Sequence, residues 1–357
     1  MWLFNSSIGR KLVMSITGAC LILFVTFHVL MNSVALIWPV AYNQVCEFLG
    51  ANWYALIASA GLAFLFIIHI AYATWLTLQN RKARGNDRYA VTSRPPQVEW
   101  ASKNMLVLGI VILAFLVVHL IQFWAKMQWQ ELRHAELAVL PQLQGGVVLP
   151  AQGTLFLQIA FSEVWTPIVY IIGFVALWFH MNHGFWSMFQ SAGWNNQNWL
   201  PRLKKIGCWW TTIVVALFVA QAIVFTVHAA NKYYLTDENL KEQYAENISE
   251  LCEPITTSLS NELNAFNEEV QQYMHNGGDM AQVQQMQKAF LENKAIDFLK
   301  KADVLVKTYN AHCAGIAAPA EYSKLENLYT QFKSACTQFG VQLPAELNPA
   351  ATQPQTK

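Results

Sequence analysis

The stretch FLFIIHIAYATW (residues 64–75) decides the fold class, because it is almost wholly apolar and yet has His69 at its centre. It lies in one of five runs that are long and apolar enough to cross a bilayer, which takes about 20 residues. These runs are residues 12–38, 53–78, 104–125, 164–190 and 206–230. A lone imidazole in hydrocarbon costs free energy unless its nitrogens are satisfied. The stretch therefore predicts a membrane helix whose histidine has a partner elsewhere in the chain.

Composition divides the 357-residue chain into two parts. Residues 1–235 hold fourteen Lys and Arg and six Asp and Glu, a net charge of +8, whereas residues 236–357 hold nine Lys and sixteen Asp and Glu, a net charge of −7. Neither part has the concentrated basic face of a nucleic-acid binder. The sequence predicts an all-α membrane protein, in which a five-transmembrane-helix bundle (1–235) is followed by an acidic soluble helical extension (236–345) and a disordered tail (346–357).

The extension has helical periodicity. Residues 289–309 repeat apolar side chains at helical spacing, and residues 239–274 and 320–338 do so more weakly. Breaks are expected at residues 275–279 and 314–320, which contain Gly or Pro. The six cysteines form no C-x-x-C or C-x-x-C-H motif, which argues against a Cys-rich zinc site and covalent c-type haem attachment. Three of them, in the extension, allow one disulfide if the compartment is oxidising: Cys252, Cys313 and Cys336.

Positive charge orients the predicted bundle, since loops rich in Lys and Arg stay in the cytoplasm. Eleven basic residues lie on the side of the N-terminus and three on the other side, which predicts a cytoplasmic N-terminus and an extension outside the cytoplasmic membrane. The eleven are Arg10, Lys11, Arg81, Lys82, Arg84, Arg88, Arg94, Lys103, Arg202, Lys204 and Lys205, and the three are Lys126, Arg133 and Lys232.

Four successive runs each contain a histidine well inside the apolar span: His28, His69, His119 and His180. At 1.5 Å per residue, His28 and His119 lie roughly 25 and 24 Å from the cytoplasmic edge, and His69 and His180 lie roughly 18 and 15 Å from it. We call His28 and His119 the outer pair, and His69 and His180 the inner pair. One membrane histidine is more often a helix–helix hydrogen bonder than a ligand, but four at two matched depths favour ligation.

Two imidazoles at one depth on facing helices are the axial ligands that a b-type haem iron requires, and bundle cores commonly hold such cofactors. Pairing His28 with His69 would leave a mismatch of roughly 7 Å in depth, which one iron cannot bridge without strong tilt. A single zinc ion bound by all four histidines fails for the same reason. The sequence therefore predicts two haem b groups, one for each pair.

Four segments resemble the cytochrome b558 family, the five-helix dihaem membrane anchors of succinate dehydrogenase and of menaquinol:fumarate reductase. They are SSIGRKLVMSITG (6–18), NRKARGNDRYAV (80–91), EWASKNMLVLG (99–109) and FHMNHGFWSMFQSAGW (179–194). The resemblance covers about residues 1–235. In that family the fourth ligand precedes a glycine by four positions, which selects His180 over His183. His183 is then expected to form a hydrogen bond near the haem edge.

The resemblance implies a non-catalytic electron-transfer subunit in the cytoplasmic membrane, with no activity of its own. A flavoprotein and an iron–sulfur protein would dock on the cytoplasmic face, and menaquinone would be the lipid partner. Electrons would pass between the iron–sulfur protein and the quinone through the two haems. The acidic extension departs from the family, whose members usually end soon after the fifth helix.

Quinone chemistry also moves protons, so an acid–base group is expected near the quinone. No Asp or Glu lies in mid-membrane, and the outer-side carboxylates are Glu47, Glu131, Glu136 and Glu163. Glu47 is the quinone-site candidate because it lies near the outer end of the helix that bears His28, although a solvated loop carboxylate is as good an interpretation. Arg10, Lys11 and Arg81 are candidates for contact with haem propionates, with snorkelling to the interface as the simpler role.

Two other functions are compatible with the pattern. One is the dihaem b subunit of another respiratory enzyme, such as a formate dehydrogenase or a hydrogenase, which the quoted segments disfavour. The other is a transporter or scaffold without haem, in which the histidines relay protons or pack. Transporters often show repeated halves or broken helices, and neither is evident in this sequence.

Overall fold

The structure, a computed structural model, is all-helical apart from one two-stranded hairpin in the residues it describes. The described residues are 6–84, 99–134, 136–191, 193–194 and 196–347. The chain forms two compact units, which we call the membrane unit (residues 1–133 and 150–234) and the tail unit (residues 134–149 and 235–357). The predicted fold class is confirmed, since five long apolar helices able to span a membrane are followed by further helices.

The five candidate spans are Ser7–Ile37, Trp53–Ala83, Trp100–Trp124, Trp165–Gln190 and Trp199–Ala230. They correspond to the helices α2 (Ser7–Ile37), α4 (Trp53–Arg84), α5 (Trp100–His119) with a π-turn η1 (Leu120–Trp124), α8 (Trp165–Ser191) and α9 (Trp199–Ala230). The hydroxyl of Ser6 caps α2 by accepting a hydrogen bond from the Gly9 amide at 2.9 Å. Large apolar side chains such as Leu23 and Ile57 are exposed on the spans, as expected where lipid covers them.

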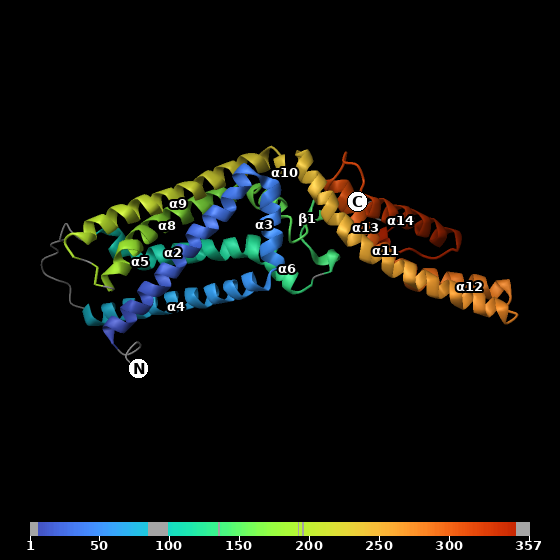
Figure 1. The fold of residues 1–357 in the computed structure, drawn as a ribbon, viewed down its shortest axis with the longest axis horizontal. Helices are drawn as coiled ribbons and strands as arrows, with labels where there is room; N and C mark the ends of the chain where they lie inside the picture. Colours follow the sequence, from blue (N-terminus) through green and yellow to red (C-terminus); the bar gives the residue numbers. More distant parts are fainter. Residues whose placement is uncertain (1–5, 85–98, 135, 192, 195, 348–357) are drawn as a thin grey trace, which may run out of the picture. The chain divides into compact units, whose positions relative to one another are not determined.

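Helix α8 is the centre of the membrane unit and packs against α2, α5 and α9 (Figure 1). Small residues allow these close approaches. A side chain at Gly173 of α8 would collide with the Phe115 ring of α5, and one at Gly207 of α9 would collide with the Phe185 ring of α8. Glycine at a helix crossing lets two membrane helices approach closely, which strengthens their van der Waals contact.

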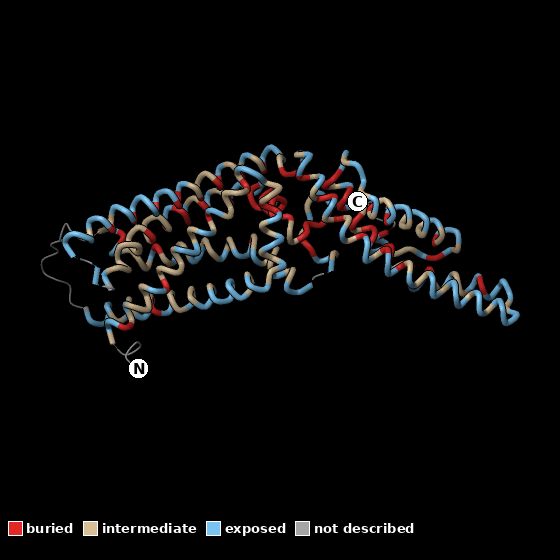
Figure 2. The backbone as a smooth tube through the Cα atoms, in the orientation of Figure 1, coloured by how far each residue is buried: buried red, intermediate tan, exposed pale blue. Residues whose placement is uncertain are grey.

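Short helices close the end of the bundle where α2 ends. Pro39 begins α3 (Pro39–Ala51), where its missing amide hydrogen costs nothing. Helix α6 (Gln128–Leu132) follows η1, and α7 (Gly153–Phe161) is almost completely buried against α3 and α9 (Figure 2). The backbone amide and the hydroxyl of Thr154 both donate to Asn43 Oδ1 at 2.9 Å, which ties α7 to α3. Helix α10 (Tyr233–Thr236) follows α9.

The tail unit contains the helices expected from periodicity, with its breaks at the expected positions. They are α11 (Glu238–His275), α12 (Met280–Phe290), a π-turn η3 (Leu291–Ala295), α13 (Ile296–His312) and α14 (Ala320–Gln338), followed by the turn η4 (Ala345–Leu347). Leu347 is buried, and residues 348–357 lie outside the described part of the chain. Cys252, Cys313 and Cys336 are buried free thiols, so the disulfide considered above is not formed.

The tail unit also contains residues that precede the last two spans. The turn η2 (Leu137–Val139) and the antiparallel strands β1 (Gln142–Leu143) and β2 (Gly146–Val147) belong to it. The Thr308 hydroxyl of α13 accepts a hydrogen bond from the Val147 amide at 3.0 Å, and His312 Nε2 donates to the Leu143 carbonyl at 2.9 Å. These bonds join the hairpin to the extension within the tail unit, although two candidate spans, α8 and α9, lie between them in the sequence.

Candidate functional site

The outer histidine pair is brought together by α2 and α5. The ring centroids of His28 and His119 are 5.8 Å apart, and the ring planes are nearly perpendicular at 88°. Phe218 of α9 and Phe123 of η1 also contact this pair. Residue count alone pairs these two histidines by depth, and the fold brings the same two rings together.

The inner pair is brought together by α4 and α8. The ring centroids of His69 and His180 are 6.3 Å apart, at an interplanar angle of 62°. The four histidines therefore form two separate pairs on four of the five spans. Among the described residues, no group of three or more His, Cys, Asp or Glu is placed to hold one metal ion.

The separation of the inner pair suits one metal between two imidazoles. A metal–nitrogen bond is about 2 Å, and each ring centroid lies about 1.2 Å beyond its nitrogen, so a linear bis-imidazole complex separates the centroids by about 6.4 Å. A directly hydrogen-bonded pair of imidazoles would bring the two nitrogens to about 3 Å and the centroids to about 5.4 Å. The inner separation of 6.3 Å matches the first distance, and the outer separation of 5.8 Å lies between the two. Imidazole nitrogens are the axial ligands of b-type haem, so both pairs have the donor set that such a group requires.

A hydrogen-bond chain orients His119. The Tyr170 hydroxyl lies 3.2 Å from His119 Nδ1 and donates to Gln122 Oε1 at 2.9 Å, and Gln122 Nε2 donates to the Thr166 hydroxyl at 3.0 Å. Tyr170 therefore accepts from Nδ1–H, which leaves Nε2 as the nitrogen available to a ligand. Gln122 lies in the π-turn η1, a feature that is frequent at functional sites. Tyr170, Gln122 and Thr166 could not be predicted as members of the site, because no pattern in the sequence indicates which side chains reach His119.

The other member of the outer pair has a competing contact. Asn32 lies one turn after His28, and its amide nitrogen is 3.2 Å from His28 Nε2 and donates to the His28 carbonyl oxygen at 2.8 Å. The Tyr42 hydroxyl of α3 donates to Asn32 Oδ1 at 3.2 Å. A ligand at Nε2 of His28 has to displace the first of these contacts, whereas the bond from Asn32 to the carbonyl oxygen can remain.

The inner pair is held more loosely. The Thr17 hydroxyl of α2 is 3.1 Å from His69 Nδ1, which leaves Nε2 of His69 available. Nδ1 of His180 is buried without a hydrogen-bond partner in the described part of the chain. Each ring borders a glycine of a neighbouring helix. A Cβ atom at Gly18 would lie 3.7 Å from Cε1 of His69, and one at Gly109 would lie 3.8 Å from Cε1 of His180. Larger residues at these positions would occupy the space beside each ring.

All four histidines have intermediate exposure, and each lies beside a histidine of another helix.

His183, the predicted hydrogen bonder near the haem edge, has a protein partner. Its Nδ1 lies 3.2 Å from Glu99 Oε2, and Lys204 Nζ lies 2.7 Å from Glu99 Oε1. Burial alone raises the pKa of Glu99, but the hydrogen bonds from Lys204 and His183 outweigh it and leave the pKa below its ordinary value. Lys204 also lies over the Trp186 ring, 4.3 Å from its centroid. The sequence analysis did not anticipate that Glu99 joins this cluster.

Glu47, the quinone-site candidate, is exposed on α3, and among the described residues no ion pair involves it. Glu131 of α6 instead packs against Gly50 at the end of α3, and Gln128 Nε2 donates to the Gly50 carbonyl at 3.4 Å. The fold therefore brings the Glu131 carboxylate to α3. The role of Glu47 stays a prediction. Arg10 and Arg202 lie over the rings of Trp75 and Trp199, consistent with side chains at a membrane interface.

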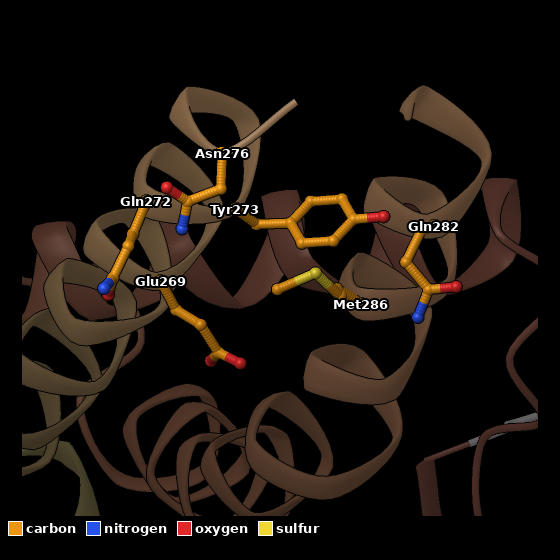
Figure 3. A pocket seen from close by; sticks show the side chains of 6 residues that line it. All are labelled: Glu269, Gln272, Tyr273, Asn276, Gln282 and Met286. Carbon is orange, nitrogen blue, oxygen red and sulfur yellow. The ribbon is translucent and has the colours of Figure 1, made fainter. Parts of the chain in front are cut away.

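A cavity of about 390 Å³ lies in the tail unit between α11 and α12 (Figure 3). It is lined by Glu269, Gln272, Tyr273, Asn276, Gln282 and Met286. This lining has one carboxylate and neither histidine, cysteine nor lysine, so it offers no acid–base pair and no metal-ligand set. The histidine pairs in the membrane unit remain the candidate site.

Comparison with known proteins supplies no independent guide to function. No family model, no curated protein and no solved structure matches the chain. The functional interpretation therefore depends on the residues and geometry described above.

Proposed function

We propose that the chain is the dihaem cytochrome b membrane anchor of a succinate:quinone oxidoreductase, that is, of a succinate dehydrogenase or quinol:fumarate reductase. It would carry electrons between a cytoplasmic iron–sulfur subunit and menaquinone. The observation that carries the proposal is the presence of two imidazole pairs at two depths, with centroid separations of 5.8 and 6.3 Å.

Each histidine pair would hold one haem b, which supplies a one-electron carrier when bound. The chain's own residues set where these carriers lie. The four histidines lie on separate helices, so packing of α2, α4, α5 and α8 sets the depth of each iron. At 1.5 Å per residue the two levels differ by roughly 8 Å, which divides a core of about 30 Å into shorter steps.

Hydrogen-bond partners set the orientation of the ligands. The hydroxyls of Tyr170 and Thr17 engage Nδ1 of His119 and His69, respectively. Such partners fix the tautomer of a ligating histidine and raise its basicity. Aromatic side chains around the outer pair, among them Phe115 and Phe218, exclude water from the interior.

The charge distribution supports the proposed orientation, with the N-terminus in the cytoplasm and the tail unit outside. Of the eleven basic residues on the N-terminal side, Arg88 and Arg94 lie outside the described residues. The partner subunits would dock on the cytoplasmic side, close to the inner pair. Menaquinone would bind near the outer pair, with Glu47 as the candidate acid–base residue.

The test is an absorbance spectrum of the purified full-length chain. We expect a b-type α-band after dithionite reduction and two haems per chain. His28→Ala or His119→Ala should remove one haem, and His69→Ala or His180→Ala should remove the other. His275→Ala, which changes an exposed histidine at the end of α11, is the matched control and should keep both haems. Absence of the band from folded wild-type protein would refute the proposal and favour a transporter or scaffold.

Copurification separates the remaining alternatives. Partner subunits that contain covalently bound flavin and iron–sulfur clusters would support the proposed complex. A molybdenum or nickel enzyme bound to the chain would instead identify the dihaem subunit of a formate dehydrogenase or hydrogenase.

A further inference from the structure

Glu99 joins three helices at one end of the membrane unit. It directly precedes α5, and its carboxylate contacts His183 of α8 and Lys204 of α9 through different oxygens, at 3.2 and 2.7 Å. Lys204 also lies over Trp186, and the rings of Trp186 and His183 are 4.8 Å apart. The carboxylate therefore has a fixed position between one cation and one imidazole.

This cluster lies at the end of the helix interface that contains His180. His183 follows His180 by three residues, about 4.5 Å along α8. Gly109 of α5 borders the His180 ring, so α5 faces the inner pair along the same interface. The rings of Trp100 and Phe179 are 5.2 Å apart and lie in the same interface. Gly109 is ten residues past Glu99 along α5, roughly 15 Å, so the inner pair is the nearer of the two histidine pairs to this cluster.

The outer pair lies much farther from this cluster. By residue count His119 is twenty residues past Glu99 along α5, roughly 30 Å. Coulomb interactions fall with distance, so a charge at this cluster acts more strongly on the inner pair than on the outer one. Glu99 and Lys204 can therefore act on the inner pair without acting equally on the outer one.

We propose that Glu99 and Lys204 tune the reduction potential of the inner iron in opposite directions, the carboxylate lowering it and the ammonium raising it. Adding an electron to an iron is disfavoured by a nearby negative charge and favoured by a positive one. His183 acts as a positioning residue that holds the carboxylate against α8. This inference rests on the proposed function, because it requires a redox centre at the inner pair.

The experiment is an optical redox titration of the purified full-length chain, with haem content measured in each variant. Glu99→Gln keeps a hydrogen-bonding group but removes the charge, and should shift the inner midpoint potential upward. Lys204→Met keeps the length of the side chain but removes its charge, and should shift the same midpoint downward. The double variant should return close to the wild-type value, and the outer midpoint should move less than the inner midpoint in each single variant.

Opposite signs distinguish electrostatic tuning from a structural role, since damage to the fold would shift both single variants in one direction or lower haem content. The matched control is Glu262→Gln, which neutralises one member of the Glu262–Lys294 pair in the tail unit and should change neither midpoint. This inference alone would be overturned if the variants keep two haems and the inner midpoint potential does not move. It would also be overturned if that potential moves in the same direction in both single variants. A wild-type chain without haem would overturn the proposed function instead.

Discussion

Tyr170 gives the sharpest test of how the fold prepares His119 for ligation. Replacing Tyr170 with Phe removes one hydroxyl and keeps a buried ring that contacts Phe115, Phe161 and Phe174. The change leaves His119 Nδ1 and Gln122 Oε1 without the partner that they share in the native chain. Packing is therefore preserved, and only the orientation and basicity of the His119 ring should change.

The expected magnitude follows from the loss of this one hydrogen-bond partner. Removing the group that orients a metal-bound histidine typically costs about 10- to 100-fold in affinity, which corresponds to about 1.4 to 2.8 kcal/mol. We therefore expect the outer haem to dissociate from Tyr170→Phe about 10 to 100 times more readily than from the wild type. The proposed inner haem, of whose two histidines His69 contacts Thr17 and neither is bonded to Tyr170, should be unaffected.

The assay is transfer of haem from the full-length chain to an excess of a haem-scavenging globin, followed by absorbance. The control is Tyr72→Phe on α4, because the Tyr72 side chain is largely buried and its hydroxyl makes no hydrogen bond within the described part of the chain. This variant should behave as the wild type. Equal haem retention in Tyr170→Phe and Tyr72→Phe would refute the orienting role of the Tyr170 hydroxyl.

Two further predictions concern the tail unit. Thr308→Val should leave the buried Val147 amide without its acceptor, at a cost of about 1 to 3 kcal/mol. Hydrogen exchange of residues 142–149 should therefore accelerate about 5- to 150-fold. Unchanged exchange would show that the hairpin does not depend on this hydrogen bond. Burial lowers the pKa of His312 from its ordinary 6.5, although its bond to the Leu143 carbonyl opposes the shift. The His312 imidazole therefore binds a proton more readily in the unfolded chain than in the folded chain. The free energy of unfolding of the tail unit should fall as the pH drops below 6.5, and should level off once the pH is below the lowered pKa of His312 in the folded chain. Thermal unfolding at pH 7.5 and 5.5 measures this loss of stability, and the loss should be smaller in His312→Gln. A variant with the same pH dependence as the wild type would exclude His312 as the source of the loss.

The sequence by itself determined the features that arise from local patterns. Hydropathy located the five spans, because each must bury about 20 successive residues in lipid. Periodicity located the long helices of the extension, and residue count sorted the four histidines into two depths. A helix has a fixed rise, so position along the chain predicts which histidines can meet, and the structure brings His28 to His119 and His69 to His180.

Tertiary structure alone decided which distant residues meet. The hydrogen bond from Val147 to Thr308 joins residues 161 positions apart and makes a loop between two spans part of the tail unit. His119 meets Tyr170 across 51 positions, and Lys204 meets Glu99 across 105. No periodicity records such contacts, because they depend on how helices rotate and pack against one another. The two histidine pairs could therefore be predicted from the chain, whereas the residues that contact them across the helix interfaces could not.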